Sequence, residues 1–141
     1  MQPGTLAETY RGTETILVVE DDAAVRSGIR RLLQWAGYHV LAAADSDEAV
    51  RQATDHQVHI HLLLIDFSLP GTTGQELAAV LRGFRPSLRV VFMSGYSEEE
   101  LPRTHGPSDA AFLQKPFATE TLLLQVRNAL HPARRRSDAV G

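Results

Sequence analysis

The sequence predicts an α/β protein in which helices cover both faces of a five-stranded parallel sheet, a doubly wound arrangement. Two observations support this prediction. Five short apolar runs of strand length alternate with longer stretches whose apolar residues repeat at helical spacing. Such strand–helix alternation requires parallel strands joined by right-handed crossovers. Charged residues directly follow two of the runs, and a lysine comes just after another, at the strand ends where open parallel sheets bind ligands.

The first predicted repeat follows a polar lead-in of residues 1–13. Ile16–Val19 is short and β-branched, as expected of a buried strand. Ala23–Ala36 carries apolar residues at helical spacing, and Gly37 stands where a helix commonly ends.

The second repeat begins with His39–Ala43, a shorter and more polar strand. Asp45 and Glu48 have the spacing of a capping box, which predicts a helix through about Gln52. Ile60–Ile65 is the most apolar run of the chain, so we expect this third strand to lie at the centre of the sheet.

A loop over Asp66–Thr73, with a Pro-Gly pair, separates the third strand from its helix. Thr73 and Glu76 form a second capping-box pattern, which predicts a helix through about Gly83. Leu88–Met93 is the predicted fourth strand.

A capping-box pattern from Ser97 predicts a short helix that stops near Pro102. Ala110–Leu113 is the fifth strand, and Thr119–Leu130 is the last helix. Residues 132–141 are expected to form a solvated tail. The whole pattern fits the flavodoxin-like strand order 2-1-3-4-5.

Composition limits the function classes. The chain has 141 residues, enough for one domain, and a net charge of −3 that gives no sign of a nucleic-acid surface. It has no cysteine, so disulfides and thiolate zinc sites are excluded. No apolar run approaches the length of a membrane span. We therefore expect a cytoplasmic domain without membrane contact, and we read Arg134–Arg136 as part of the tail.

Three strand ends should meet at one edge of the sheet, bringing together Glu20-Asp21-Asp22, Asp66 and Lys115. Crowded carboxylates repel one another, and a hard divalent cation such as Mg²⁺ relieves that repulsion. We expect Asp22 to begin the first helix, while Glu20 and Asp21 face the crevice.

Each remaining candidate has a structural and a chemical interpretation. Asp66 fits a turn aspartate, but it also fits a nucleophile that attacks a phosphoryl group. Lys115, the only lysine of the chain, fits a surface residue or a charge placed on a phosphoryl oxygen. A cis bond to Pro116 would turn it back over the crevice. Ser94 fits an ordinary turn or a hydroxyl donor to phosphate.

Together these residues resemble the receiver domain of two-component response regulators, over residues 14–131. The resemblance rests on the motifs in combination and in order. They are Ile16-Leu17-Val18-Val19-Glu20-Asp21-Asp22, Asp66-Phe67-Ser68-Leu69-Pro70-Gly71 with Gly74, Ser94-Gly95, and Lys115-Pro116-Phe117.

The resemblance implies a role for each residue. Asp66 would be the phosphorylated aspartate. Mg²⁺ would be held by Asp66, Asp21, Glu20 through water, and the backbone carbonyl of Ser68. Ser94 and Lys115 would contact the phosphoryl group, and Phe112 would turn inward when Ser94 engages it. Such a domain is a phosphoacceptor, with self-phosphorylation and autodephosphorylation as its only catalysis.

The implied phosphodonor is a histidine kinase or a histidine phosphotransfer domain. The resemblance implies that phosphorylation changes the partner affinity of the face made by helix four, strand five and helix five. A homodimer would form through the same face. The downstream partner, stimulus and cognate kinase are not specified by the sequence. Residues 12–21 and Phe92–Ser97 are similar to C-terminal receivers of hybrid sensor kinases. The chain is therefore expected to be either the receiver of a hybrid histidine kinase, which this similarity favours, or a stand-alone regulator.

Many such domains carry Asn where this chain has Ser68, and the side chains at Ser68 and Tyr96 flank the attacking water in such domains. We therefore hypothesise an unusual phosphoryl lifetime. Phe112 also lacks the hydroxyl of the commoner tyrosine, so its inward state needs no buried polar partner.

Other functions fit less well. A haloacid-dehalogenase-like phosphatase needs an acid at the position of Ser68, and a nucleotide binder would be repelled by the acidic triplet. A pseudo-receiver that acts as a protein-interaction module stays open as the alternative. His59 and His61 alternate near a strand start, but two ligands do not make a zinc site.

Overall fold

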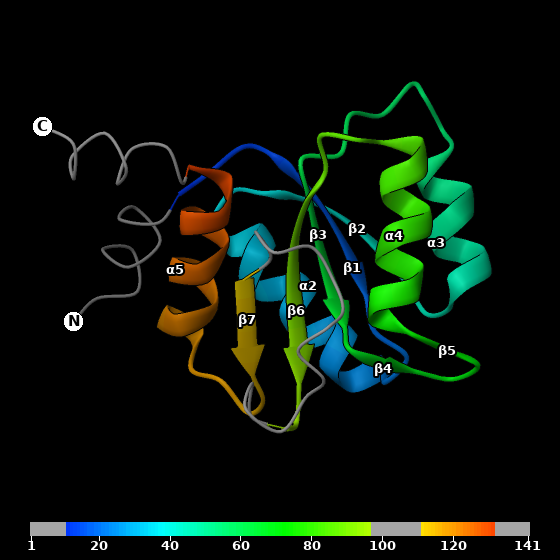
Figure 1. Ribbon diagram of the computed structural model, residues 1–141. Coiled ribbons are helices and arrows are strands. Elements are labelled where there is room, and N and C mark those ends of the chain that lie inside the picture. The colour runs from blue at the N-terminus through cyan, green and yellow to red at the C-terminus, as the bar shows by residue number, and fades with distance from the viewer. Residues whose placement is uncertain (1–10, 97–110, 132–141) are drawn as a thin grey trace, which may run out of the picture.

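The computed structural model describes residues 11–96 and 111–131 and shows one parallel sheet between two helical layers (Figure 1). All neighbouring strands of this sheet run parallel, in the order β2-β1-β3-β6-β7. This is the predicted order 2-1-3-4-5, with β6 and β7 as the fourth and fifth strands. The strands are β1 (Thr15–Val19), β2 (His39–Ala43), β3 (Leu62–Asp66), β6 (Arg89–Ser94) and β7 (Ala111–Gln114).

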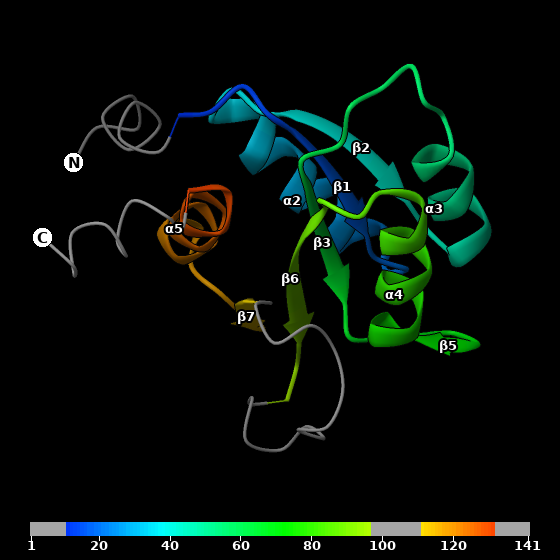
Figure 2. The same cartoon turned by 45° about the horizontal axis from the view of Figure 1, so that its top comes forward.

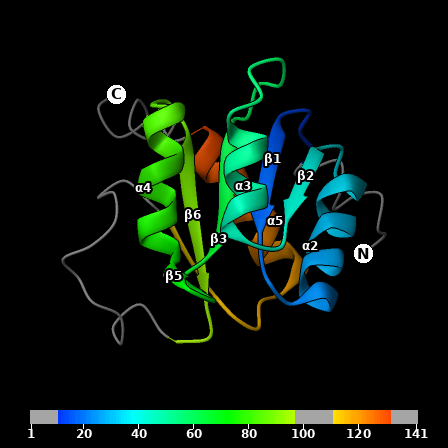
Figure 3. The same cartoon turned by 90° about the vertical axis from the view of Figure 1, so that its right-hand side faces the viewer.

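Within residues 11–96 and 111–131, two helices pack on each face of the sheet. Helices α2 (Ala23–Trp35) and α5 (Thr119–Leu130) pack on one face, and α3 (Ser46–Ala53) and α4 (Gly74–Phe84) pack on the other. Figure 2 shows the sheet between these pairs, and in Figure 3 α3 and α4 lie in front of it.

The sheet separates two apolar cores. Along β1, Ile16 and Val18 join the core under α2 and α5, while Leu17 and Val19 join the core under α3 and α4. Because both faces are covered, the central strands are apolar without alternation. Every residue of β3 is buried, and β3 pairs with β1 and β6, so the predicted central position of this run is confirmed.

The helix caps follow local sequence closely. The Asp22 carboxylate caps α2 by accepting hydrogen bonds from Ala24 N and Val25 N. Gly37 follows this helix with a φ of 102°, a backbone conformation that favours glycine. Thr73 and Glu76 form the predicted capping box of α4.

The cap of α3 differs in one bond. Asp45 Oδ1 accepts from Glu48 N at 2.9 Å, as a capping box requires. The Glu48 side chain, however, accepts from Ala44 N, one residue before the cap. The predicted helix start is therefore right, but the reciprocal bond is shifted by one residue.

The predicted loop after β3 contains a small antiparallel ribbon, β4 (Ser68–Leu69) and β5 (Thr72–Thr73). Gly71 allows the tight reversal between them with a φ of 81°. The predicted cap at Ser97, the stop near Pro102 and the tail with Arg134–Arg136 lie outside the described residues. Across residues 11–96 and 111–131, no helix combines the length and apolarity of a membrane span.

Candidate functional site

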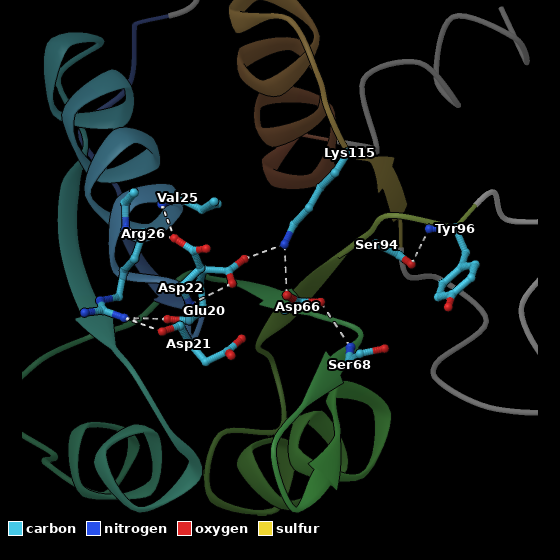
Figure 4. A network of polar contacts seen from close by, with 11 residues as sticks. Glu20, Asp21, Asp22, Val25, Arg26, Asp66, Ser68, Ser94, Tyr96 and Lys115 are labelled. Carbon is cyan, nitrogen blue, oxygen red and sulfur yellow. Dashed lines mark hydrogen bonds and ion pairs between the residues drawn. The ribbon is translucent and has the colours of Figure 1, made fainter.

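Three charged side chains meet at the carboxyl ends of β1, β3 and β7 (Figure 4). Lys115 Nζ lies 2.6 Å from Glu20 Oε1 and 2.9 Å from Asp66 Oδ2. Asp66 is the last residue of β3, Glu20 follows β1 and Lys115 follows β7. The Lys115–Pro116 peptide bond is cis. The structure thus brings together residues that are up to 95 positions apart in the sequence.

Burial and neighbouring charges shift the pKa of two groups in this cluster. Glu20 is only 1% exposed, and burial raises its pKa despite the hydrogen bonds from Lys115 and from Asp22 N. For Lys115, burial acts to lower the pKa, but the hydrogen bonds and charges of Glu20 and Asp66 outweigh it, so the pKa is raised. The Lys115 ammonium therefore forms ion pairs with two largely buried carboxylates.

A third carboxylate completes an acidic group. One oxygen each of Glu20, Asp21 and Asp66 lies within 4.8 Å of the others. Asp21 is exposed, and among residues 11–96 and 111–131 no donor is bonded to its carboxylate. Hard carboxylate oxygens at this spacing are the ligand type that Mg²⁺ prefers.

Asp22 plays a different part from its two acidic neighbours. Its side chain caps α2, while its backbone N donates to Glu20 Oε2 at 3.1 Å. The structure thus separates the triplet as the sequence suggested. Asp22 begins the helix, whereas Glu20 and Asp21 lie with Asp66.

Arg26 is a residue of the site that the sequence interpretation missed. From the first turn of α2, its Nη1 donates to Glu20 O at 2.7 Å and to Asp21 O at 3.4 Å. A helix N-terminus disfavours a positive charge, and the only acid at the start of α2 is the Asp22 cap, whose carboxylate is already bonded to Ala24 N and Val25 N. That mismatch was a signal that this arginine has a partner outside the helix.

The segment after β3 holds the Asp66 carboxylate from the other side. Ser68 N donates to Asp66 Oδ1 at 3.1 Å. Gly74 N donates to Phe67 O at 2.7 Å, and a Cβ atom at Gly74 would collide with the backbone of Asp66 and Phe67. The position of Asp66 therefore depends on close contact between its strand end and the start of α4.

Ser94 and Phe112 lie on the neighbouring strands. Ser94 is 2% exposed, its Oγ accepts from Tyr96 N at 2.9 Å, and its carbonyl accepts from Lys115 N at 2.7 Å. Phe112 is half-buried, with its ring centroid 6.4 Å from that of Phe67. The backbone bond to Lys115 links the end of β6 to the lysine of the acidic cluster.

The histidines stand apart from this site. His59 and His61 lie before β3 with ring centroids 4.3 Å apart. His61 Nδ1 accepts from Thr15 N at 3.0 Å, which leaves the ring proton on Nε2 and removes the lone pair a metal would need. Within the described part of the chain, the acidic cluster is the only group of three residues able to hold a metal ion. His105 lies outside the described residues.

The sequence model of the response regulator receiver domain matches residues 16–127. The sensor kinase CckA of Brucella abortus is 36% identical over 126 residues, which cover 88% of this chain but 13% of the kinase. The response regulator receiver protein CpdR of the same organism is 32% identical over 82% of this chain and 95% of its own length. The matched region is thus a small part of one relative and nearly all of another.

Solved structures agree with these matches. The crystal structure of the receiver domain from the hybrid histidine kinase CckA is 38% identical, with a TM-score of 0.70, and covers 83% of this chain and 99% of that one. The response regulator TrrA of Thermotoga maritima, solved in complex with Mg²⁺-BeF, is 25% identical with a TM-score of 0.69. It covers 84% of this chain and 100% of that one.

Proposed function

The chain belongs to the response regulator receiver domain family, and from that premise we propose that Asp66 accepts a phosphoryl group from a phosphohistidine. The donor is a histidine kinase or a histidine phosphotransfer domain. The observation that carries this proposal is the placement of the Asp66 carboxylate between Lys115 Nζ, at 2.9 Å, and the Ser68 N–H, at 3.1 Å.

The transfer is a substitution at phosphorus. A carboxylate oxygen of Asp66 attacks the phosphorus atom, the P–N bond to the donor imidazole breaks, and its electron pair stays on the leaving nitrogen. The product is an acyl phosphate. Lys115 places a positive charge beside the developing phosphoryl charge, and the Ser94 hydroxyl, whose oxygen already accepts from Tyr96 N, has its own proton to donate.

We further propose that Glu20, Asp21, Asp66 and the Ser68 backbone carbonyl hold Mg²⁺. The three carboxylates offer hard oxygens within 4.8 Å of one another, and the Asp21 carboxylate is exposed. When bound, the cation neutralises phosphoryl oxygens during transfer. The TrrA relative was solved with Mg²⁺-BeF, which supports the same cation here.

Phosphorylation would then act as a switch. The added negative charge draws Lys115 and the Ser94 hydroxyl toward Asp66. Movement of Ser94 pulls on Tyr96 through the bond to its N–H, and Phe112 follows inward. The face that includes β7 and α5 would change its affinity for a partner protein or a second copy. The predicted fourth helix of that face lies outside the described residues.

The parent protein is a further proposal. The match to CckA and the sequence before β1 favour a hybrid histidine kinase, of which this chain would be the receiver. CpdR, of which the match covers 95%, is a relative of nearly the same length as this domain and supports the alternative of a stand-alone regulator. With either origin, we propose that the domain acts in the cytoplasm, beside its phosphodonor.

The proposal is tested by intact-mass spectrometry after incubation with acetyl phosphate and Mg²⁺. We expect a gain of one phosphoryl group that is lost without Mg²⁺ and in Asp66→Ala. The matched control Asp47→Ala removes an exposed carboxylate on α3 and should be modified like the wild type. A folded wild-type protein that gains no phosphoryl group would contradict the proposal and favour a pseudo-receiver.

A further inference from the structure

Arg26 contacts the acidic turn from the side opposite Lys115 (Figure 4). Its Nη1 donates to Glu20 O at 2.7 Å and more weakly to Asp21 O at 3.4 Å. The first bond is short, as expected of a charged donor. These are backbone contacts, so the arginine acts on the path of the turn rather than on either carboxylate.

The rest of this turn is already well held. Glu20 N donates to Ala43 O at 3.1 Å, and the Glu20 side chain accepts from Asp22 N and Lys115 Nζ. Asp22 is fixed as the cap of α2. Arg26 supplies the donors for the two carbonyl oxygens. With these bonds made, the backbone that carries the exposed Asp21 side chain is held at both carbonyl oxygens.

The charge of Arg26 by itself would work against a cation site. A guanidinium near the ligands repels a divalent ion, and a positive charge in the first turn opposes the helix dipole. Any benefit to cation binding must therefore come from ordering the turn. Holding ligands in place before the ion arrives is the usual role of groups that bond to metal ligands without touching the metal.

We propose that Arg26 is a positioning residue of the cation site, which fixes the Glu20–Asp21 backbone so that the Asp21 carboxylate stays beside Glu20 and Asp66. This inference rests on the proposed phosphoacceptor function and deepens it. The residue does not touch the phosphoryl group. It acts through the two carbonyl oxygens that it binds.

The test compares Arg26→Ala, Arg26→Lys and Arg30→Ala. Arg30 lies one turn further along α2 and is exposed, so Arg30→Ala removes the same charge without touching the turn. Mn²⁺ serves as the probe, and the loss of its free-ion signal in electron paramagnetic resonance reports binding without any phosphoryl transfer. We expect Arg26→Ala to weaken Mn²⁺ binding about tenfold, in the range typical for groups that orient metal ligands. Arg26→Lys should recover part of the loss, and Arg30→Ala should bind as tightly as the wild type or slightly more tightly.

Phosphorylation by acetyl phosphate gives a second readout. In Arg26→Ala the Mg²⁺ concentration for half-maximal rate should rise about tenfold, while the rate at saturating Mg²⁺ stays near that of the wild type. A general loss of structure would lower both. If Arg26→Ala does not keep the wild-type circular dichroism spectrum, the same comparison is made with Arg26→Gln, which retains one donor.

The outcomes separate this inference from the proposed function. Equal Mn²⁺ affinity in the wild type and Arg26→Ala would overturn the inference, as would tighter binding in both Arg26→Ala and Arg30→Ala, which would show that only charge matters. A wild type that binds Mn²⁺ but gains no phosphoryl group would instead overturn the phosphoacceptor function. Weaker Mn²⁺ binding in Arg26→Ala would, in that case, still support the positioning role.

Discussion

The two edges of the parallel sheet carry similar residue types in different bonding states. At the carboxyl edge, Glu20 and Asp66 share one ammonium, and the Asp21 carboxylate is exposed. At the amino edge, His131 Nε2 lies 3.3 Å from Glu14 Oε2, and His61 Nδ1 accepts from Thr15 N.

The backbone at the amino edge is also tightly fitted. Gly12 N donates to Ala36 O at 3.1 Å, and a Cβ atom at Gly12 would collide with the Tyr38 ring. Polar groups at this edge therefore bond to one another and to the backbone. The carboxyl edge instead keeps more negative than positive charge, which is what a divalent cation requires. Polar residues at the amino edge thus stabilise the fold, whereas those at the carboxyl edge are available to bind a ligand.

The largest effect is expected from Lys115→Met, which removes the ammonium group that pairs with Glu20 and Asp66. The rate of phosphorylation by acetyl phosphate should fall roughly 100-fold, the usual cost of losing one preorganised charge. The free energy of unfolding should also fall, by roughly 1–3 kcal/mol, because buried Glu20 loses its charged partner. Quenched time courses and urea unfolding measure the two quantities. A variant that is phosphorylated at the wild-type rate would show that Lys115 takes no part in phosphoryl transfer.

Gly74→Ala should have the next largest effect, because a Cβ atom there meets the backbone of Asp66 and Phe67. We expect a loss of roughly 1–3 kcal/mol in the free energy of unfolding, together with slower phosphorylation as the strand end shifts. Gly83→Ala is the matched control on the same helix, where a Cβ atom meets nothing within 4 Å. It should stabilise the fold by roughly 0.4–1 kcal/mol and leave the rate unchanged. Similar results for the two variants, from urea unfolding, would contradict the close packing at Asp66.

A smaller change is expected in the lifetime of the phosphoryl group. Ser68 and Tyr96 are exposed beside the site, where they can affect the approach of water. Ser68→Asn and Tyr96→Ala should each change the rate at which the phosphoryl adduct decays, measured by mass spectrometry after removal of the donor. Phe84→Ala alters an exposed aromatic at the far end of α4 and should leave the decay unchanged. Unaltered decay in both site variants would end this hypothesis.

We expect the smallest effect at the amino edge, where His61 makes the free energy of unfolding depend on pH. Burial lowers its pKa and the neighbouring His59 lowers it further, while Glu14 acts in the opposite direction. The unfolded chain therefore takes up a proton at His61 before the folded protein does, and the free energy of unfolding falls as pH drops below about 6.5.

His61→Asn keeps an acceptor for the Thr15 N–H but cannot titrate. It should lose less stability than the wild type between pH 7 and pH 5 in urea unfolding, with phosphorylation unaffected. His56→Asn, at an exposed histidine, should follow the wild-type curve. Parallel pH curves for His61→Asn and the wild type would show that His61 titrates normally.

Much of the fold could be predicted because its signals are local. The apolar runs, the caps at Asp22 and Thr73 and the end at Gly37 each depend on neighbours within a few residues. The meeting of Asp66 with Lys115 was predictable from topology, since parallel strands bring their carboxyl ends to one edge.

Other features depend on tertiary contacts that periodicity does not encode. The reach of Arg26 back to the acidic turn depends on side-chain direction, not on helical spacing. The ribbon of β4 and β5 has strands of two residues, too short for any alternating pattern. The fit of Gly12 against Tyr38 joins segments that are adjacent only after folding.

The most direct test of the central claim locates the phosphoryl group by chemistry. After incubation with acetyl phosphate and Mg²⁺, sodium borohydride reduces an acyl phosphate on aspartate to the alcohol of homoserine, which peptide mass spectrometry can place in the sequence. We predict homoserine at position 66 alone, dependent on Mg²⁺. Homoserine at another aspartate, or none from a folded protein that has gained a phosphoryl group, would contradict the assignment of Asp66 as the acceptor.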